Sequence, residues 1–204
     1  IHGNLTAANA IASARMVERK LGIRPISGGE PHEKKLLVQK PGETILRTGK
    51  LEVNNSAFWR EYDIAQDQPL MRAATLVIDN FVSQPFYNEM RTKQQLGYIV
   101  WGGASRKEKR LQAYFIIQSA SHPADELQRR ADAFLKTLPG KFEALPGSEF
   151  ERLKSAAREK VKEQPKSIGE KAGILFSRAY DHDGDFNREQ ATLEAIDDLT
   201  KAEA

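Results

Sequence analysis

The spacing of apolar residues changes along the chain, and these changes predict a succession of helices and strands. Asn4 or Thr6 can cap a first helix that runs to about Leu21, where Gly22 is suited to end it. The segment 23–32 is rich in proline and glycine and is predicted to be a loop.

Three short segments with strand character follow: Lys35–Lys40, Thr44–Val53 and Ala57–Ala65. Pro41-Gly42 separates the first two, and Asn54-Asn55, a pair suited to a hairpin turn, separates the last two. Because the breaks are short, we expect the three strands to pair antiparallel.

A helical pattern begins at Pro69, with apolar residues on one stripe: Leu70, Met71, Ala74, Val77, Ile78, Phe81 and Val82. Pro85 is expected to interrupt this helix, and a second helical piece is expected to reach about Gln95. Gly97 ends that piece. Two strands of a hairpin are then predicted, Tyr98–Gly103 and Leu111–Gln118, with a charged tip between them.

The remainder is predicted to be helical, with apolar stripes around Leu127 to Leu138, Phe150 to Val161, and Ile168 to Ala179. The capping boxes Ser148-x-x-Glu151 and Ser167-x-x-Glu170 are expected to begin the last two helices. The order of elements predicts an α+β fold, an antiparallel sheet with helices packed on one face.

Length and composition fit a single α+β domain over residues 1–204, because 204 residues with 40% hydrophobic side chains can bury one core. No apolar run approaches the roughly 18 residues of a membrane span. The chain begins at Ile1, and Thr200 with Glu203 forms a capping box at its very end. We therefore expect a piece of a longer protein.

Charge and metal-ligand patterns argue against several function classes. The net charge is only +3, and basic residues alternate with acidic ones, which argues against a nucleic-acid partner. The histidines lie far apart, at positions 2, 32, 122 and 182, and no H-E-x-x-H or H-x-x-E-H is present, so no metal site is expected. Asp181–Asp185 resembles the start of a calcium loop, but Phe186 and Thr192 replace its required Gly and Glu.

One stretch, residues 86–100, combines a helix end, a glycine and a strand start. Arg91 stands near the helix C-terminus, where the helix dipole favours a cation, and Tyr98 opens the strand. Junctions of this kind are common places for site residues. Taken by themselves, the residues favour an ordinary terminal charge and a sheet tyrosine.

The same stretch, from Arg91 to Tyr98, is similar to the R-T-x-x-Q-L-G-Y motif in the last domain of the pitrilysin and insulysin (insulin-degrading) metallopeptidases. Further segments resemble that domain in the same order: residues 1–6 at its start, Phe115–Ser119 after the hairpin, and Pro165 with Ser167–Glu170 in its later helices.

The resemblance implies a zinc metalloendopeptidase whose four related domains form two halves around a chamber for peptides. The first domain would bind the zinc, and this chain would be the zinc-free C-terminal domain, which closes the chamber and is inactive alone. By position, Tyr98 matches a catalytic tyrosine that hydrogen-bonds the scissile carbonyl, and Arg91 matches an arginine that binds the substrate backbone. The implied partners are a peptide substrate and the N-terminal half of the same protein. The resemblance favours the periplasm, with the cytoplasm as the alternative.

Two other functions stay open from the sequence. Relatives of this fold also serve as non-catalytic scaffolds or subunits that bind peptides or partner domains without hydrolysis. A basic helical nucleic-acid binder is the third reading, and it predicts salt-dependent retention on DNA. The presence of Arg91 together with Tyr98 favours the enzyme.

Overall fold

The computed structural model describes residues 2–22, 36–50 and 52–204. Within them the elements run in the order α1 (Ala7–Leu21), β1 (Ser56–Gln66), α2 (Pro69–Tyr87), the π-helix η1 (Asn88–Lys93), β2 (Ile99–Lys107), β3 (Arg110–Ser119), α3 (Ala124–Leu135), α4 (Leu138–Glu143), α5 (Gly147–Lys162), α6 (Ile168–Tyr180) and α7 (Arg188–Asp198). The chain divides into two units, a larger one of residues 38–162 and 189–204 and a smaller one of residues 1–37 and 163–188.

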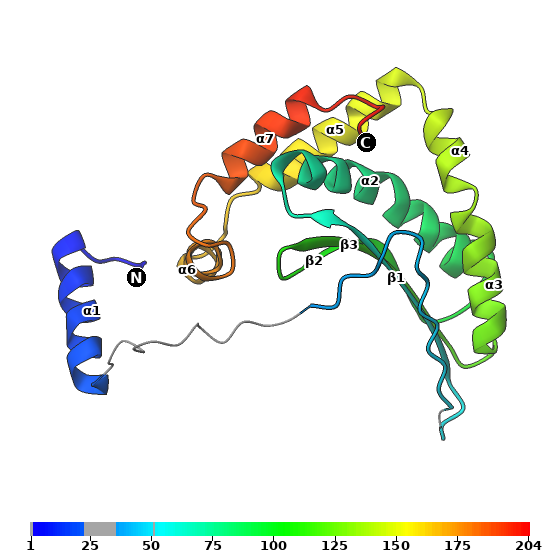
Figure 1. Cartoon of the computed structure of the whole chain (residues 1–204), viewed down its shortest axis with the longest axis horizontal. Helices are drawn as coiled ribbons and strands as arrows, with labels where there is room; N and C mark the ends of the chain where they lie inside the picture. The colour runs from blue at the N-terminus through cyan, green and yellow to red at the C-terminus, as the bar shows by residue number, and fades with distance from the viewer. Residues whose placement is uncertain (1, 23–35, 51) are drawn as a thin grey trace. The chain divides into compact units, whose positions relative to one another are not determined.

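The larger unit is built on a three-stranded antiparallel sheet in the order β1-β3-β2. Phe58 of β1 and Val100 of β2 both stand opposite Ile117 of the central strand β3, and all three side chains are buried. Helices α2 and α3 lie on this face of the sheet, as Figure 1 shows. The predicted fold class, an antiparallel sheet with helices packed on it, is confirmed.

Helix α2 is the centre of the larger unit because it contributes to two hydrophobic clusters. Toward the sheet and α3 it buries Val82 and Phe86, and the Phe86 ring contacts Phe115 and Phe134 at centroid distances of 4.9 and 5.7 Å. On its other side it buries Ala73, Ala74 and Val77 against α5 and the α7 region (Figure 1), with Phe150, Ala157, Ile196 and Leu199 completing that cluster. The predicted stripes of α2, α3 and α5 therefore face the core.

The predicted strands before β1 are wrong in the described residues. Only Ala57–Ala65 forms a strand, as part of β1, whereas residues 36–50 and 52–55 form none. Apolar side chains in this segment, such as Leu37 and Leu46, are 75% and 70% exposed. Alternation favours an extended backbone, but a strand also needs a neighbour to pair with, and β1 pairs with β3 instead. The Asn54-Asn55 hairpin is therefore absent too.

Pro85 does not interrupt its helix. Helix α2 runs through it to Tyr87 and continues directly into η1. A proline in a helix interior costs about 3 kcal/mol. The full burial of the neighbouring Phe86 and of Val77 two turns earlier offsets that cost, because these side chains hold the helix against both clusters.

The predicted N-caps and C-caps can be compared one by one with the observed helix ends. Thr6 caps α1, its hydroxyl accepting from the Asn9 N–H at 3.2 Å, and Gly22 ends that helix at φ 59°. Ser167 caps α6 in the same way, accepting from Glu170 N–H at 3.0 Å. Helix α5 already includes Gly147, so Ser148 is not its N-cap and that prediction is wrong.

The smaller unit contains α1 and α6, and neither helix buries a side chain. On α6 the rings of Phe176 and Tyr180 stack at 5.6 Å while both stay exposed. The predicted loop over residues 23–32 lies outside the described residues. That residues 1–204 form a single domain stays a prediction.

Candidate functional site

The candidate site lies where η1 passes into β2. Helix α2 widens there into a π-turn, in which Gln94 N–H bonds to the Glu89 carbonyl at 3.0 Å and Leu96 N–H to the Met90 carbonyl at 2.9 Å. Met90 and Leu96 are fully buried and anchor both ends of the turn in the core. Such π-turns within helices are frequent at functional sites. Arg91 lies between these two buried anchors in the sequence and is itself only partly buried.

Gly97 is required by the close approach of β3. A Cβ atom at this position would lie 1.9 Å from the carbonyl oxygen of Gln118, far inside van der Waals contact. The missing side chain lets Tyr98 N–H bond to the same carbonyl oxygen at 3.1 Å. The glycine therefore fixes where β2 begins and where Tyr98 projects.

Arg91 and Tyr98 come together at this junction. The Arg91 guanidinium donates to the Gly97 carbonyl oxygen at 2.5 Å, and its Cζ lies 5.3 Å from the centre of the Tyr98 ring. Tyr98 is nevertheless 84% exposed. A cation over an aromatic ring is attracted to its face, so the two predicted site residues form one pair, with Tyr98 exposed and Arg91 partly buried.

An open depression beside the pair is lined by Tyr87, Arg91, Thr92 and Gln95. Gln95 has φ 53°, the left-handed region that non-glycine residues seldom adopt. This conformation ends the π-turn and exposes the Gln95 side chain next to Arg91. Tyr87 and Gln95 were not predicted as site residues from the sequence, and the glutamine of the R-T-x-x-Q-L-G-Y motif is the signal that could have indicated Gln95.

A chain of polar side chains joins η1 to α3. Glu89 accepts from Gln94 Nε2 at 3.0 Å and from Lys93 Nζ at 3.1 Å. These two hydrogen bonds, that of Gln94 first, lower the pKa of the Glu89 carboxyl below its ordinary value. Gln94 in turn accepts from Arg130 at 3.3 Å, and Arg130 donates to Glu126. Sequence reasoning missed this chain because its members are distant in sequence.

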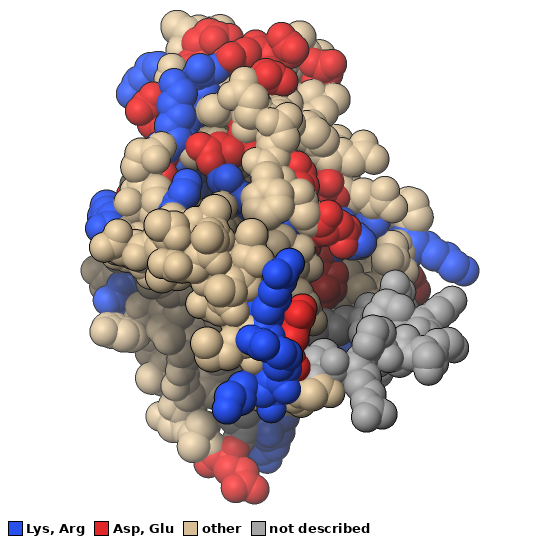
Figure 2. Space-filling model, turned by 90° about the vertical axis from the view of Figure 1, so that its left-hand side faces the viewer, with Lys and Arg blue, Asp and Glu red and all other residues tan. Residues whose placement is uncertain are grey.

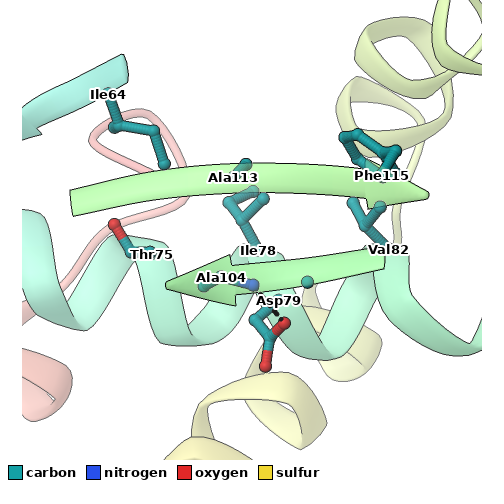
Figure 3. A pocket seen from close by; sticks show the side chains of 9 residues that line it. Ile64, Thr75, Ile78, Asp79, Val82, Ala104, Ala113 and Phe115 are labelled. Carbon is teal, nitrogen blue, oxygen red and sulfur yellow. Dashed lines mark hydrogen bonds between the residues drawn. The ribbon is translucent and has the colours of Figure 1, made fainter. Parts of the chain in front are cut away.

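Asp79 holds α2 to strand β2, as Figure 3 shows. Its Oδ1 accepts from Ala104 N–H at 2.8 Å and from Ser83 Oγ at 2.8 Å, while Lys160 Nζ lies 2.8 Å from Oδ2. A Cβ on Gly103 would lie 2.9 Å from Oδ1, so the glycine admits this contact. The adjoining cavity of about 30 Å³ has room for little more than a water molecule, and the carboxylate serves packing.

Other parts of the described chain offer few alternatives. No group of three or more His, Cys, Asp or Glu side chains in residues 2–22, 36–50 and 52–204 could hold a metal ion. His122 Nδ1 lies 3.0 Å from Ser121 Oγ, within a turn after β3. On the face in Figure 2, basic side chains lie among acidic ones. None of the helices searched in the described residues is long and apolar enough to cross a membrane.

Comparisons with known proteins show which proteins this chain is similar to. Residues 77–176 match the family described as PQQ synthase PqqF-like, C-terminal lobe domain 4. The insulin-degrading enzyme of Drosophila melanogaster is 33% identical over 127 residues, which are 62% of this chain and 13% of that protein. The chain spans less than a fifth of the length of the curated relatives compared.

Solved structures give the same fold. The crystal structure of pitrilysin matches with a TM-score of 0.77 at 24% identity, covering 98% of this chain and 21% of that protein. The periplasmic protease PqqL from Escherichia coli matches with a TM-score of 0.60 at 13% identity, covering 98% and 22%. The chain is thus similar in sequence to PqqF-like C-terminal lobe domains and to the insulin-degrading enzyme, and its fold is of the pitrilysin type.

Proposed function

We propose that this chain is the C-terminal domain of a zinc metalloendopeptidase, in which it closes a peptide chamber and contacts the substrate opposite the zinc. The observation that carries the proposal is the contact between the partly buried Arg91 and the exposed Tyr98, within the part of the chain that matches the family. The zinc and its general base would belong to the N-terminal half, since no candidate ligand cluster occurs in the described residues of this chain.

Tyr98 would donate its phenolic hydrogen to the carbonyl oxygen of the scissile peptide. That oxygen gains negative charge as the bond is attacked, and a fixed donor stabilises the charge more in the transition state than in the ground state. The 84% exposure of Tyr98 leaves the phenol accessible, while the Gly97–Gln118 approach fixes its backbone. Loss of one such donor typically costs about 10²–10³ in rate.

Arg91 would bind the peptide backbone beside the cut. A guanidinium carries five N–H donors, of which Arg91 directs one at the Gly97 carbonyl. The open depression at its side gives a peptide access to the others. Because such binding is present in the ground state as well, its loss should act mainly on KM.

Two substitutions in the full-length parent test the proposal. Tyr98→Phe should lower kcat by more than tenfold with the zinc content unchanged, because only the hydroxyl is removed. Arg91→Ala should mainly raise KM for a peptide substrate. A parent that binds peptides without cleaving them would instead support the non-catalytic scaffold. An unchanged kcat in Tyr98→Phe would remove Tyr98 from the catalytic role.

The isolated chain should not cleave peptides, because it would lack the metal site and the base. Zinc-dependent cleavage by the purified chain, at a level above a mock purification, would contradict this. We further propose a periplasmic location, in line with the description of PqqL as a periplasmic protease. Recovery of the parent only in the cytoplasmic fraction would favour the alternative.

A further inference from the structure

The π-turn that carries Arg91 is closed twice by the same two residues. The backbone N–H of Gln94 bonds to the Glu89 carbonyl at 3.0 Å, and the Gln94 side chain bonds to the Glu89 carboxylate at 3.0 Å. In an α-helix, residues five apart point about 140° away from each other, so they cannot pair in this way. The side-chain bond therefore favours the π-turn over a regular helix.

The other end of the Gln94 amide is braced against α3. Its Oε1 accepts from Arg130 at 3.3 Å, and Arg130 in turn donates from Nε and Nη2 to Glu126 Oε1, at 3.0 and 2.5 Å. Helix α3 is anchored by the buried side chains Leu127, Ala131 and Phe134. The hydrogen bond from Arg130 to Gln94 thus links the π-turn to helix α3, which is anchored in the core.

We propose that Gln94 and Arg130 are positioning residues that hold Arg91 in its substrate-binding geometry. This inference rests on the proposed function of Arg91. If the turn relaxed toward an α-helix, Arg91 would rotate about the helix axis, by roughly 100° for each residue of register lost. It would then leave the Gly97 carbonyl and the Tyr98 ring, its two contacts at the junction. Misplacement by about 1 Å can cost up to about 10² in rate.

The test uses the full-length parent with a peptide substrate. Gln94→Ala and Arg130→Gln should each raise KM about three- to tenfold with kcat within twofold, reproducing in part the effect of Arg91→Ala. In the Arg91→Ala background the same substitutions should have no further effect, because the residue they position is gone. A general loss of folding would instead lower the active fraction, and hence apparent kcat, in both backgrounds.

Arg129→Gln is the matched control. Arg129 is the neighbouring arginine on α3, its side chain is 72% exposed, and it lies 3.8 Å from the same Glu126. The substitution removes the same charge without touching Gln94, so KM should stay within twofold of the wild type. An equal rise of KM in this control would show a general charge effect and overturn the inference.

Exchanging the carboxylate of Glu89 and the amide of Gln94 should restore KM. Gln94→Glu alone should raise KM, since it places a second carboxylate against Glu89. The double variant Glu89→Gln with Gln94→Glu restores a donor and an acceptor and should return KM to within twofold. If Arg91→Ala raises KM while Gln94→Ala and Arg130→Gln do not, the positioning role is wrong and the proposed function stands. If Arg91→Ala leaves KM unchanged, both the positioning role of Gln94 and Arg130 and the proposed function of Arg91 are wrong.

Discussion

The two ends of helix α2 use polar side chains in opposite ways. Before its N-terminus, Asp67 has a side chain only 4% exposed, and it accepts from Arg72 Nε at 2.9 Å and from Arg106 Nε at 2.6 Å. Arg72 also donates to Thr192 of α7 at 2.6 Å. At the C-terminal end, η1 leads to Tyr98, which is 84% exposed.

The surroundings of each end explain the difference. Asp67, Arg72 and Arg106 form a cluster that is enclosed by helix α7 and the β2–β3 hairpin. The hydrogen bonds of this cluster are made to other residues of the fold, so they contribute to stability. The π-turn instead places its buried anchors, Met90 and Leu96, inward and leaves Arg91 beside an open depression. A helix can therefore enclose polar side chains at one end and leave them accessible at the other, depending on what packs around it.

The largest effect is expected from Gly97→Ala, which breaks the C-terminal junction. The new Cβ would overlap the Gln118 carbonyl oxygen, so β2 must separate from β3 at its start. We expect a loss of at least about 3 kcal/mol in the free energy of unfolding, measured by urea denaturation. Gly140→Ala is the control, since a Cβ there meets nothing within 4 Å, and its change should stay within about 1 kcal/mol. Equal stability of the two variants would refute the packing argument.

Asp67→Asn should produce the next largest effect and sharpen the contrast between the ends. The substitution removes a buried charge that faces two arginines, and the free energy of unfolding should fall by about 2–3 kcal/mol. Because the cluster lies at the opposite end of α2 from Arg91, KM of the full-length parent should not change at a temperature where the variant is folded. A raised KM without loss of stability would show that the N-terminal end also serves binding.

The smallest effect is expected from Glu89→Gln, at the C-terminal end of α2, on the stability at acid pH. Because the pKa of Glu89 is lowered in the folded state, its contribution to stability is present above its unfolded pKa and is lost as the pH falls through the folded pKa. Glu89→Gln should therefore flatten the decline of the urea midpoint below about pH 4.5, near the ordinary glutamate value. An acid decline as steep as that of the wild type would mean that the Gln94 and Lys93 hydrogen bonds do not act on Glu89 in solution.

Local chemistry made several elements predictable from the sequence. Thr6 and Ser167 cap their helices because a hydroxyl two or three residues before free N–H groups can bond to them without help from the rest of the fold. The stripes of α2, α3 and α5 were predictable because a helix presents every third or fourth residue to one side. The structure of residues 36–50 was not predictable in this way, because alternating apolar and polar residues leave open whether a partner strand exists.

The candidate site was likewise predictable only in part. The sequence alone placed Arg91 and Tyr98 at a helix-to-strand junction, and resemblance to a family motif gave them roles that stay predictions. The packing of the folded chain determines that the junction is a π-turn, that Gly97 touches Gln118, and that Gln94 joins Glu89 to Arg130. These contacts link residues up to 36 positions apart, and no local pattern specifies them, because they arise when α2, α3 and the sheet pack around a shared core.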